Sequence, residues 1–140
     1  MRESIDSWFM RIAKLVAERS TCNRKHVGTV LVKNRRIIST GYNGSLPGDN
    51  HCEDVGCDIH QDPVHGETCV RTTHSEKNAI NQAAYHGVST NGCTAYVTCY
   101  PCYRCLQDLI VAGIKEVVFL ENYDDIRNKS LIHNILIRKI

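Results

Sequence analysis

Residues 95–120 read AYVTCYPCYRCLQDLIVAGIKEVVFL, and this stretch decides the fold. Ala95–Thr98 is short and apolar, as expected of a strand. Cys102–Ala112 is typical of a helix, and Gly113 follows where a helix stop is expected. Glu116–Leu120 is rich in β-branched and apolar residues and predicts another buried strand. Strands that alternate with helices in this way predict an α/β layered domain.

The N-terminal part of the sequence predicts a helix followed by a hairpin. Ser4–Arg19 is the expected helix. Val27–Val32 is rich in β-branched residues and predicts a strand, Lys33–Arg35 a short polar turn and Arg36–Tyr42 the returning strand. The face of the helix expected to be buried carries apolar residues at helical spacing: Trp8, Ile12, Leu15 and Val16.

Between these two regions, Asn43–Thr72 shows no clear periodicity. A loop of that length is unusual in a small domain unless something fixes it. Ser75–His86 predicts a helix with Gly87 at its left-handed end. Further on, Asp124–Asn134 predicts a last helix, whereas Ile135–Ile140 is compatible with either a strand or a helical tail.

Length and charge limit the function. The 140 residues, of which 42% are apolar, suffice for one compact domain over residues 1–140. The net charge is +2 without a basic block, which argues against long DNA or RNA but permits a small anionic substrate. We see no signal core or membrane-spanning stretch, so we expect a cytoplasmic protein whose eight cysteines serve metal and thiol chemistry.

Two short motifs carry the chemistry, His74-Ser75-Glu76 and Pro101-Cys102-Tyr103-Arg104-Cys105. Cys102 and Cys105 are three residues apart at the start of a predicted helix, so both sulfurs can reach one ion, and the helix N-terminus favours thiolates. His74 supplies a third ligand. Three protein ligands leave the fourth position of a tetrahedral zinc ion open, which is typical of catalytic rather than structural sites.

Glu76 is the candidate proton carrier. It follows His74 by two residues, about 200° around an ideal helix, so both side chains cannot easily bind the same ion. In the first helical turn it can still reach the open position, where a general base must lie. A lone C-x-x-C could be a redox pair or half of a zinc ribbon; the combination H-x-E…P-C-x-x-C is the signature of zinc nucleobase deaminases.

With these motifs the chain resembles the zinc-dependent cytidine deaminase-like superfamily, and within it the deoxycytidylate (dCMP) deaminase family. The resemblance covers most of the chain, from Trp8 to about Tyr123. Besides the two motifs, it depends on Val27-Gly28-Thr29-Val30, Gly41-Tyr42-Asn43-Gly44-Ser45, His51-Cys52, Gly56-Cys57, Cys69-Val70-Arg71-Thr72, Lys77-Asn78-Ala79-Ile80, Tyr96-Val97-Thr98 and Ala112-Gly113-Ile114-Lys115.

The resemblance implies a three-layer α/β/α fold with a mixed central sheet of about five strands. It implies hydrolytic deamination of dCMP to dUMP and ammonia by a zinc-activated water, with Glu76 passing the proton to the base. Asn43 matches the position that binds the sugar, and Tyr100 is a candidate to line the pocket. Ser75 departs from the alanine usual in the family, and we do not expect so small a residue to change the chemistry.

The resemblance also implies regulation and assembly. Members are typically homohexamers, activated by dCTP, with Mg2+ accompanying the triphosphate, and inhibited by dTTP. Arg24, Lys25 and Lys33 are possible phosphate partners for such an effector. The effector element that the resemblance implies comprises Gly41, Tyr42, Asn43 and Gly44 together with Arg24. The alternative interpretation is that Gly41–Gly44 is a plain turn after a strand.

Four cysteines form a separate set. A second, structural zinc would explain how the long loop is fixed, and some family members carry one in this region. Reduced, partly buried thiols are the alternative. Cys93 and Cys99 are expected to be packing residues. The candidate ligands are Cys22, Cys52, Cys57 and Cys69, with His51, His60 or His65 able to replace one of them.

Two other functions remain open. One is a different zinc deaminase of the same fold, acting on tRNA adenosine or a riboflavin precursor. The other is a non-catalytic, zinc-ordered binding module, in which Glu76 would have no task. The sequence does not identify the group that binds a substrate phosphate, and surface solvation is the simpler role for the candidates Arg71, Lys77 and Arg104.

Overall fold

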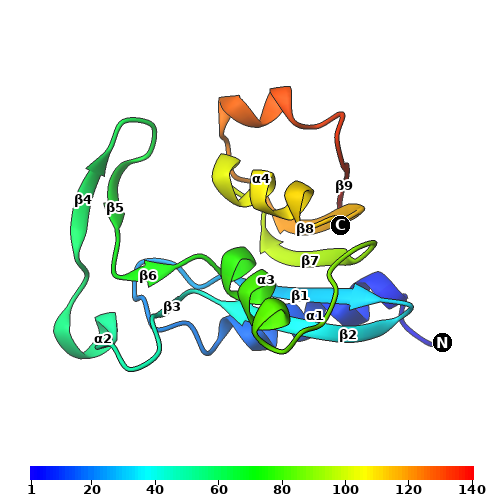
Figure 1. Cartoon of the computed structure of the whole chain (residues 1–140), viewed down its shortest axis with the longest axis horizontal. Coiled ribbons are helices and arrows are strands. Elements are labelled where there is room, and N and C mark those ends of the chain that lie inside the picture. The colour runs from blue at the N-terminus through cyan, green and yellow to red at the C-terminus, as the bar shows by residue number, and fades with distance from the viewer.

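The computed structural model describes residues 1–140 and contains a five-stranded mixed sheet between helical layers (Figure 1). The strand order is β2-β1-β7-β8-β9. β1 pairs antiparallel with both β2 and β7, while β7–β8 and β8–β9 are parallel. The strands are β1 (Gly28–Lys33), β2 (Arg36–Tyr42), β7 (Thr94–Cys99), β8 (Glu116–Glu121) and β9 (Leu136–Lys139).

The helices lie on opposite faces of this sheet. α1 (Ile5–Ala17) covers one face, and α3 (Ser75–Tyr85) and α4 (Tyr103–Val111) cover the other (Figure 1). The predicted three-layer α/β/α arrangement and the mixed five-stranded sheet are therefore confirmed. None of the helices is long and apolar enough to cross a lipid bilayer.

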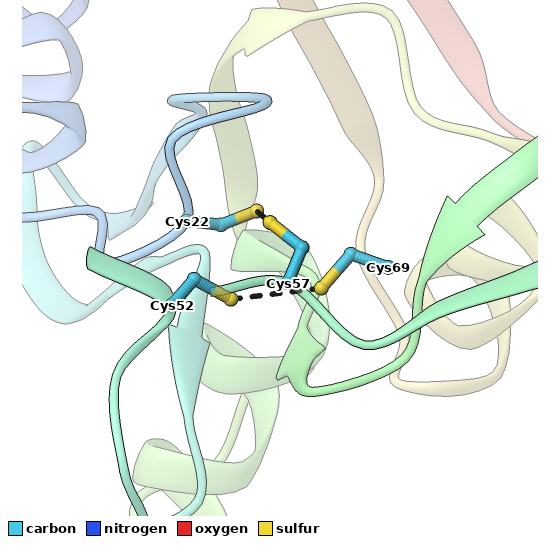
Figure 2. Close-up of side chains that lie close together, drawn as sticks. All are labelled: Cys22, Cys52, Cys57 and Cys69. Carbon is cyan, nitrogen blue, oxygen red and sulfur yellow. Dashed lines mark hydrogen bonds between the residues drawn. The ribbon is translucent and has the colours of Figure 1, made fainter. Parts of the chain in front are cut away.

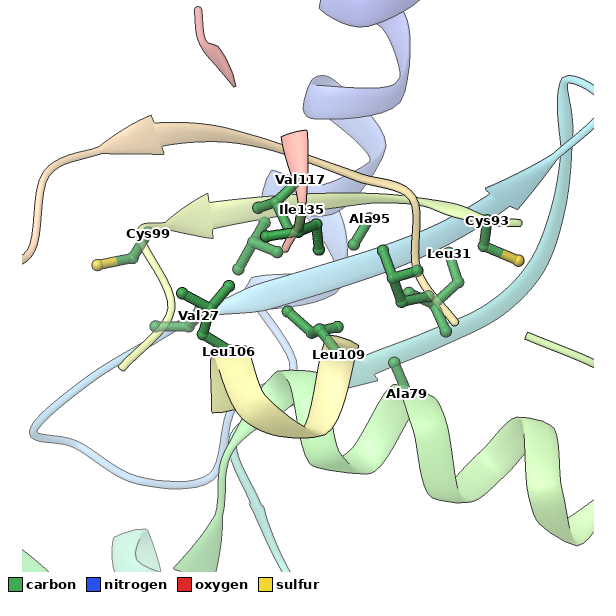
Figure 3. Close-up of a cluster of buried hydrophobic side chains, with 12 residues drawn as sticks. Val27, Leu31, Ala79, Cys93, Ala95, Cys99, Leu106, Leu109, Val117 and Ile135 are labelled. Atoms are coloured by element: carbon green, nitrogen blue, oxygen red, sulfur yellow. The ribbon is translucent and has the colours of Figure 1, made fainter. Parts of the chain in front are cut away.

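Alternation along β1 divides the core in two. Leu31 packs with Leu106 and Leu109 on the α3 and α4 side, in the cluster of buried side chains drawn in Figure 3. Val30 and Val32 point to the other face, against α1. Because neighbouring strand residues point to opposite faces, Thr29 lies on the same side as Leu31 and faces α3.

The first hairpin forms as predicted. Asn34 and Arg35 connect β1 to β2, and both have positive φ values, of 51° and 61°. Two consecutive residues in this conformation make the tight turn whose twist matches that of a hairpin. The C-terminal segment, which the sequence left open, is strand β9, paired with β8.

The prediction for the buried face of α1 is correct in part, because Ile12 and Val16 pack against the buried cluster on this side of the sheet. Trp8 and Leu15 are 40% and 64% exposed. The fully buried residues of the helix are Phe9, Met10, Ala13 and Ala17. The helix approaches β1 very closely, since a Cβ on Gly28 would come within 2.1 Å of the carbonyl oxygen of Ala13. Small side chains therefore occupy the point of closest approach, at Ala13 and Ala17.

Two segments differ from their predicted structure. The helix expected over Asp124–Asn134 was wrong, because only Ile126–Ser130 is helical, as a 3-10 turn called η1. The loop over residues 43–72 holds several short elements, of which the β4–β5 hairpin projects from the body of the domain (Figure 1). These elements, with β6 at the end of the loop, are β3 (Gly44–Ser45), α2 (Cys52–Val55), β4 (Ile59–Asp62), β5 (Gly66–Cys69) and β6 (Thr72–Thr73).

Candidate active site

The structure brings His74, Cys102 and Cys105 together although they lie on two helices. His74 immediately precedes α3, Cys102 immediately precedes α4, and Cys105 lies in the first turn of α4. Their ligand atoms lie within 4.8 Å of one another. His74 Nδ1 is 3.2 Å from Cys105 Sγ and 3.6 Å from Cys102 Sγ. Ligands of a tetrahedral zinc ion are separated by roughly 3.5–3.8 Å, given its bond lengths; the second distance lies in this range and the first is slightly shorter, so this donor set is compatible with zinc.

The two cysteine thiols of this group differ in their pKa values. Hydrogen bonding from Cys105 and from His74 lowers the pKa of Cys102 to about 3. The same contact to Cys102, together with burial, raises the pKa of Cys105. Zinc binds cysteine as the thiolate, so Cys102 has the ligand form already and Cys105 would lose its proton on binding the ion.

Glu76 lies beside these ligands but is not one of the grouped atoms. It occupies the first turn of α3 and is only 4% exposed. Its side chain lines a small cavity that His74 and Cys102 also line. The arrangement leaves the carboxylate free to act on a molecule in the cavity, whose walls are Lys25, Val27, Asn43, His74, Glu76, Cys99, Tyr100, Cys102 and Tyr123.

The two predicted substrate residues, Asn43 and Tyr100, both line this cavity. Asn43 is fixed at both ends of its amide: its Oδ1 accepts from the Ser75 backbone N–H at 2.9 Å, and its Nδ2 donates to the Lys25 carbonyl at 3.2 Å. The ring of Tyr100 stands edge-on to Phe119, with ring centroids 4.8 Å apart. Both side chains therefore have defined positions at the cavity wall.

Lys25 and Tyr123 are cavity residues that the sequence did not predict for this site. The Lys25 ammonium lies 4.4 Å from the centroid of the Tyr123 ring. The Tyr123 hydroxyl contacts His65, and His65 in turn lies 3.3 Å from the Arg127 guanidinium. These residues come from three separate segments without regular periodicity, so no local pattern could have grouped them.

The four remaining candidate ligands also converge (Figure 2). The sulfurs of Cys22, Cys52, Cys57 and Cys69 lie within 4.8 Å of one another. Cys22 and Cys57 are 3.8 Å apart, and Cys52 and Cys69 are 3.6 Å apart. Such separations match the roughly 3.8 Å between thiolates around one tetrahedral zinc ion.

One thiol of this four-cysteine cluster is poised to ionise. Burial raises the pKa of Cys69, but hydrogen bonds from the backbone N–H groups of Arg71 and Asp58 outweigh it and lower the pKa to about 7. Burial raises the pKa of Cys52. His51, His60 and His65, considered as replacements, are not in this group of ligand atoms; His60 contacts Asp58, and His65 contacts Tyr123.

The predicted effector element packs against α3. A Cβ on Gly41 would come within 2.3 Å of the Ser75 carbonyl oxygen, so Gly41 is required for this close contact. The Tyr42 carbonyl accepts from Asn78 at 2.7 Å. Gly44 pairs with Thr73 in a short two-stranded sheet. Arg24 is exposed on the surface.

The three phosphate candidates named from the sequence do not reach the cavity. Lys77 forms a salt bridge with Asp108 at 3.4 Å, in an open groove between α3 and α4. Arg71 donates to the Gly56 carbonyl at 3.1 Å, and Arg104 is exposed.

The last two cysteines were expected to be packing residues. Cys93 is a buried core residue, and Cys99 belongs both to the core and to the cavity wall.

Residues 3–121 match the family model described as the cytidine and deoxycytidylate deaminase zinc-binding region. The chain is 46% identical over 122 residues to ComE operon protein 2 of Bacillus subtilis, which covers 87% of this chain and 62% of that protein. It is 38% identical over 136 residues to the deoxycytidylate deaminase of Schizosaccharomyces pombe, covering 94% of this chain and 42% of the relative. The chain thus spans less than two thirds of these relatives.

Among solved structures, the fold is similar to that of the dCMP deaminase from the cyanophage S-TIM5 in complex with dCMP and dUMP. The TM-score is 0.80 at 26% sequence identity, and the alignment covers 100% of this chain and 99% of the phage protein.

Proposed function

The chain belongs to the cytidine and deoxycytidylate deaminase family, and from this premise we propose that it hydrolyses dCMP to dUMP and ammonia. The curated relatives named deoxycytidylate deaminase and the likeness to the phage enzyme solved with dCMP and dUMP support this substrate. Activity on tRNA adenosine or a riboflavin precursor is the alternative that the substrate test must separate.

One observation carries the proposal. A buried carboxylate, Glu76, shares a cavity with three zinc-compatible ligands and remains outside their group. A structural zinc site binds four protein ligands and needs no neighbouring acid. An open site beside a general base is the arrangement that hydrolysis requires.

The chemistry divides between the metal and the side chains. His74, Cys102 and Cys105 would hold a zinc ion, which would supply the Lewis acidity that makes water a nucleophile near neutral pH. The Glu76 carboxylate takes a proton from the water that attacks C4 of the cytosine ring and delivers it to N3. It then carries a proton to the departing amino group, so that ammonia leaves and the uracil carbonyl remains. Asn43 holds the sugar at the cavity wall.

Lys25 lines the cavity, and its ammonium group is our candidate for binding the 5′-phosphate of dCMP. Lys25 forms no salt bridge in the structure, so its charge is available to a ligand. The charge of Arg127 is already paired with Asp125 at 2.9 Å. We therefore assign the phosphate contact to Lys25, with His65 and Tyr123 as hydrogen-bonding neighbours.

The test is the loss of dCMP absorbance in the ultraviolet, with deoxycytidine and tRNA as parallel substrates. We expect turnover of dCMP and its loss in Glu76→Gln, by a factor of at least about 100, with zinc retained. Normal turnover in this variant would refute the role of Glu76. Turnover of tRNA but not of dCMP would favour the alternative.

We further propose that the four-cysteine cluster binds a second, structural zinc ion. Four thiolates fill a tetrahedron and leave no open position, so this ion would order the loop rather than react. Cys22 precedes the loop and the other three lie within it. One ion would therefore join the segment after α1 to α2 and β5.

Regulation and assembly remain part of this proposal. We expect activation by dCTP with Mg2+ and inhibition by dTTP, with the exposed Arg24 and the Gly41–Gly44 element as the candidate effector residues. Exposed apolar side chains on the helical face, such as Val111 at 87% exposure, support assembly into a homo-oligomer, for which we expect a hexamer. The cytoplasmic location likewise stays a prediction.

A further inference from the structure

Two buried hydroxyl groups form a hydrogen-bonded chain from the sheet to Glu76. Thr29 Oγ1 on β1 lies 2.8 Å from Ser75 Oγ, and Ser75 Oγ lies 2.5 Å from Glu76 Oε1. Thr29 and Ser75 are fully buried, and Glu76 is 4% exposed. Because water has no access to the two hydroxyls, these contacts have to satisfy their hydrogen-bonding capacity.

Glu76 fixes the direction of hydrogen-bond donation along this chain of hydroxyl groups. An ionised carboxylate can only accept, so Ser75 must donate its single hydroxyl proton to Glu76 Oε1. Ser75 Oγ can then only accept from Thr29, whose proton points toward it. The hydroxyl protons of Thr29 and Ser75 therefore have one arrangement while Glu76 is charged.

Ser75 itself cannot move away. Its backbone N–H donates to Asn43 Oδ1 at 2.9 Å, and the missing side chain of Gly41 lets its carbonyl lie against β2. The hydroxyl that contacts Glu76 is thus held by the sheet through Thr29 and by the cavity wall through Asn43.

We propose that Ser75 is a positioning residue for Glu76. Its hydroxyl holds Oε1, so the other carboxylate oxygen is left to meet the reacting atoms. A charge-assisted hydrogen bond from a rigid donor restricts the carboxylate to one orientation, and correct orientation before reaction lowers the barrier. The middle residue of the His-x-Glu motif, usually alanine in the family, therefore has a task in this chain. The catalytic consequence rests on the proposed dCMP deamination, whereas the positioning itself does not.

The experiment compares zinc-loaded wild type with Ser75→Ala. We expect the variant to lose about tenfold in kcat for dCMP with KM within about twofold, because the ground-state contacts to the nucleotide remain. In crystal structures of both proteins we expect one Glu76 rotamer in the wild type and more than one in the variant. Thr29→Val should give a smaller loss of kcat, and Thr29→Ser, which keeps the hydroxyl, should restore it.

Ser39→Ala is the matched control. Ser39 is also buried and also donates to α3, at 2.6 Å to the Ala79 carbonyl, but it does not reach Glu76. We expect this variant to lose thermal stability and keep kcat, which separates positioning from a merely structural role.

Support requires both the kcat loss and the released Glu76 side chain in Ser75→Ala. If Glu76 keeps its single wild-type rotamer, or if kcat is unchanged, the inference is overturned. A wild type inactive toward dCMP would refute the proposed function, and the Glu76 rotamers alone would then decide whether Ser75 positions the carboxylate.

Discussion

The carboxylate of Asp125 accepts a hydrogen bond from the backbone N–H of Tyr103, at 3.1 Å. Tyr103 is the first residue of α4, and Cys102 before it makes no capping hydrogen bond with its side chain. The N–H groups in the first turn of a helix need an acceptor from outside it. Asp125 provides one from a distant segment, which leaves the Cys102 sulfur free for a metal ion.

Replacing Asp125 should therefore weaken the fold around α4. Hydrogen bonds from Arg127 and from the Tyr103 backbone lower the pKa of Asp125 to about 2, and its side chain is 0% exposed. A lowered folded-state pKa stabilises the protein above the unfolded pKa. We expect Asp125→Asn to lose about 2 kcal/mol of unfolding free energy at pH 7, measured by urea titration.

The stabilisation by the Asp125 carboxylate should depend on pH. The stabilisation is complete above about pH 4 and is lost as the pH falls toward 2, so wild type and Asp125→Asn should converge over that interval. Asp124→Asn serves as the control, because Asp124 is exposed beside it. A constant difference between wild type and Asp125→Asn down to pH 2 would contradict the role of the charge.

Lys25 should discriminate nucleotides from nucleosides. Lys25→Met removes the cation at the cavity rim and should raise KM for dCMP at least about tenfold, the worth of one charge-assisted contact. KM for deoxycytidine, which lacks the phosphate, should not change. Steady-state kinetics with both substrates measure this split, and Lys115→Met, at an exposed lysine directly before β8, is the matched control. An equal effect on both substrates would remove the phosphate assignment.

Metal counting tests the four-cysteine cluster. We expect two zinc ions per chain in the wild type and one in Cys57→Ser, with loss of thermal stability in the variant. Substitution with Co2+ should give thiolate-to-metal charge-transfer absorption that Cys57→Ser reduces. Cys93→Ala is the control, because Cys93 is buried in the core away from both ligand groups. A single zinc per wild-type chain would leave these cysteines as ordinary thiols.

The sequence predicted the elements whose signals are local. The motif halves each opened a helix, and His74 and Cys102 indeed stand directly before α3 and α4. The first hairpin and the central strands carry β-branched runs, which need no partner to be recognised. The three ligands of the site could therefore be predicted from the sequence, because their spacing coincides with the predicted starts of two helices.

Long-range packing explains what the sequence missed. The β4–β5 hairpin was not predicted because Ile59–Asp62 is largely polar and exposed and shows no alternation. The helix expected after β8 is replaced by a 3-10 turn, where Asp125 and Asn128 direct their side chains to the backbone around α4: Asn128 donates to the Pro101 carbonyl at 2.9 Å. Polar side chains that compete for backbone groups disfavour a regular helix.

Gly41 gives the last prediction, since its part in the motif has two explanations. If the glycine is there for packing, Gly41→Ala must push α3 away from β2, because the new Cβ would lie 2.3 Å from the Ser75 carbonyl oxygen and 2.4 Å from the Ala79 nitrogen. We expect a loss of about 2–3 kcal/mol in unfolding free energy, as for other overpacked sites. Activity should fall as well, because Ser75 and Glu76 would shift with the start of the helix.

Gly44→Ala is the matched comparison within the same motif. Its Cβ would meet only the edge of the Tyr42 ring, at 3.1 Å, and a side chain can yield where backbone cannot. We therefore expect a smaller destabilisation than in Gly41→Ala when both are unfolded in urea under the same conditions. Equal stability of the two variants, with loss of nucleotide regulation alone, would instead favour an effector role for Gly41.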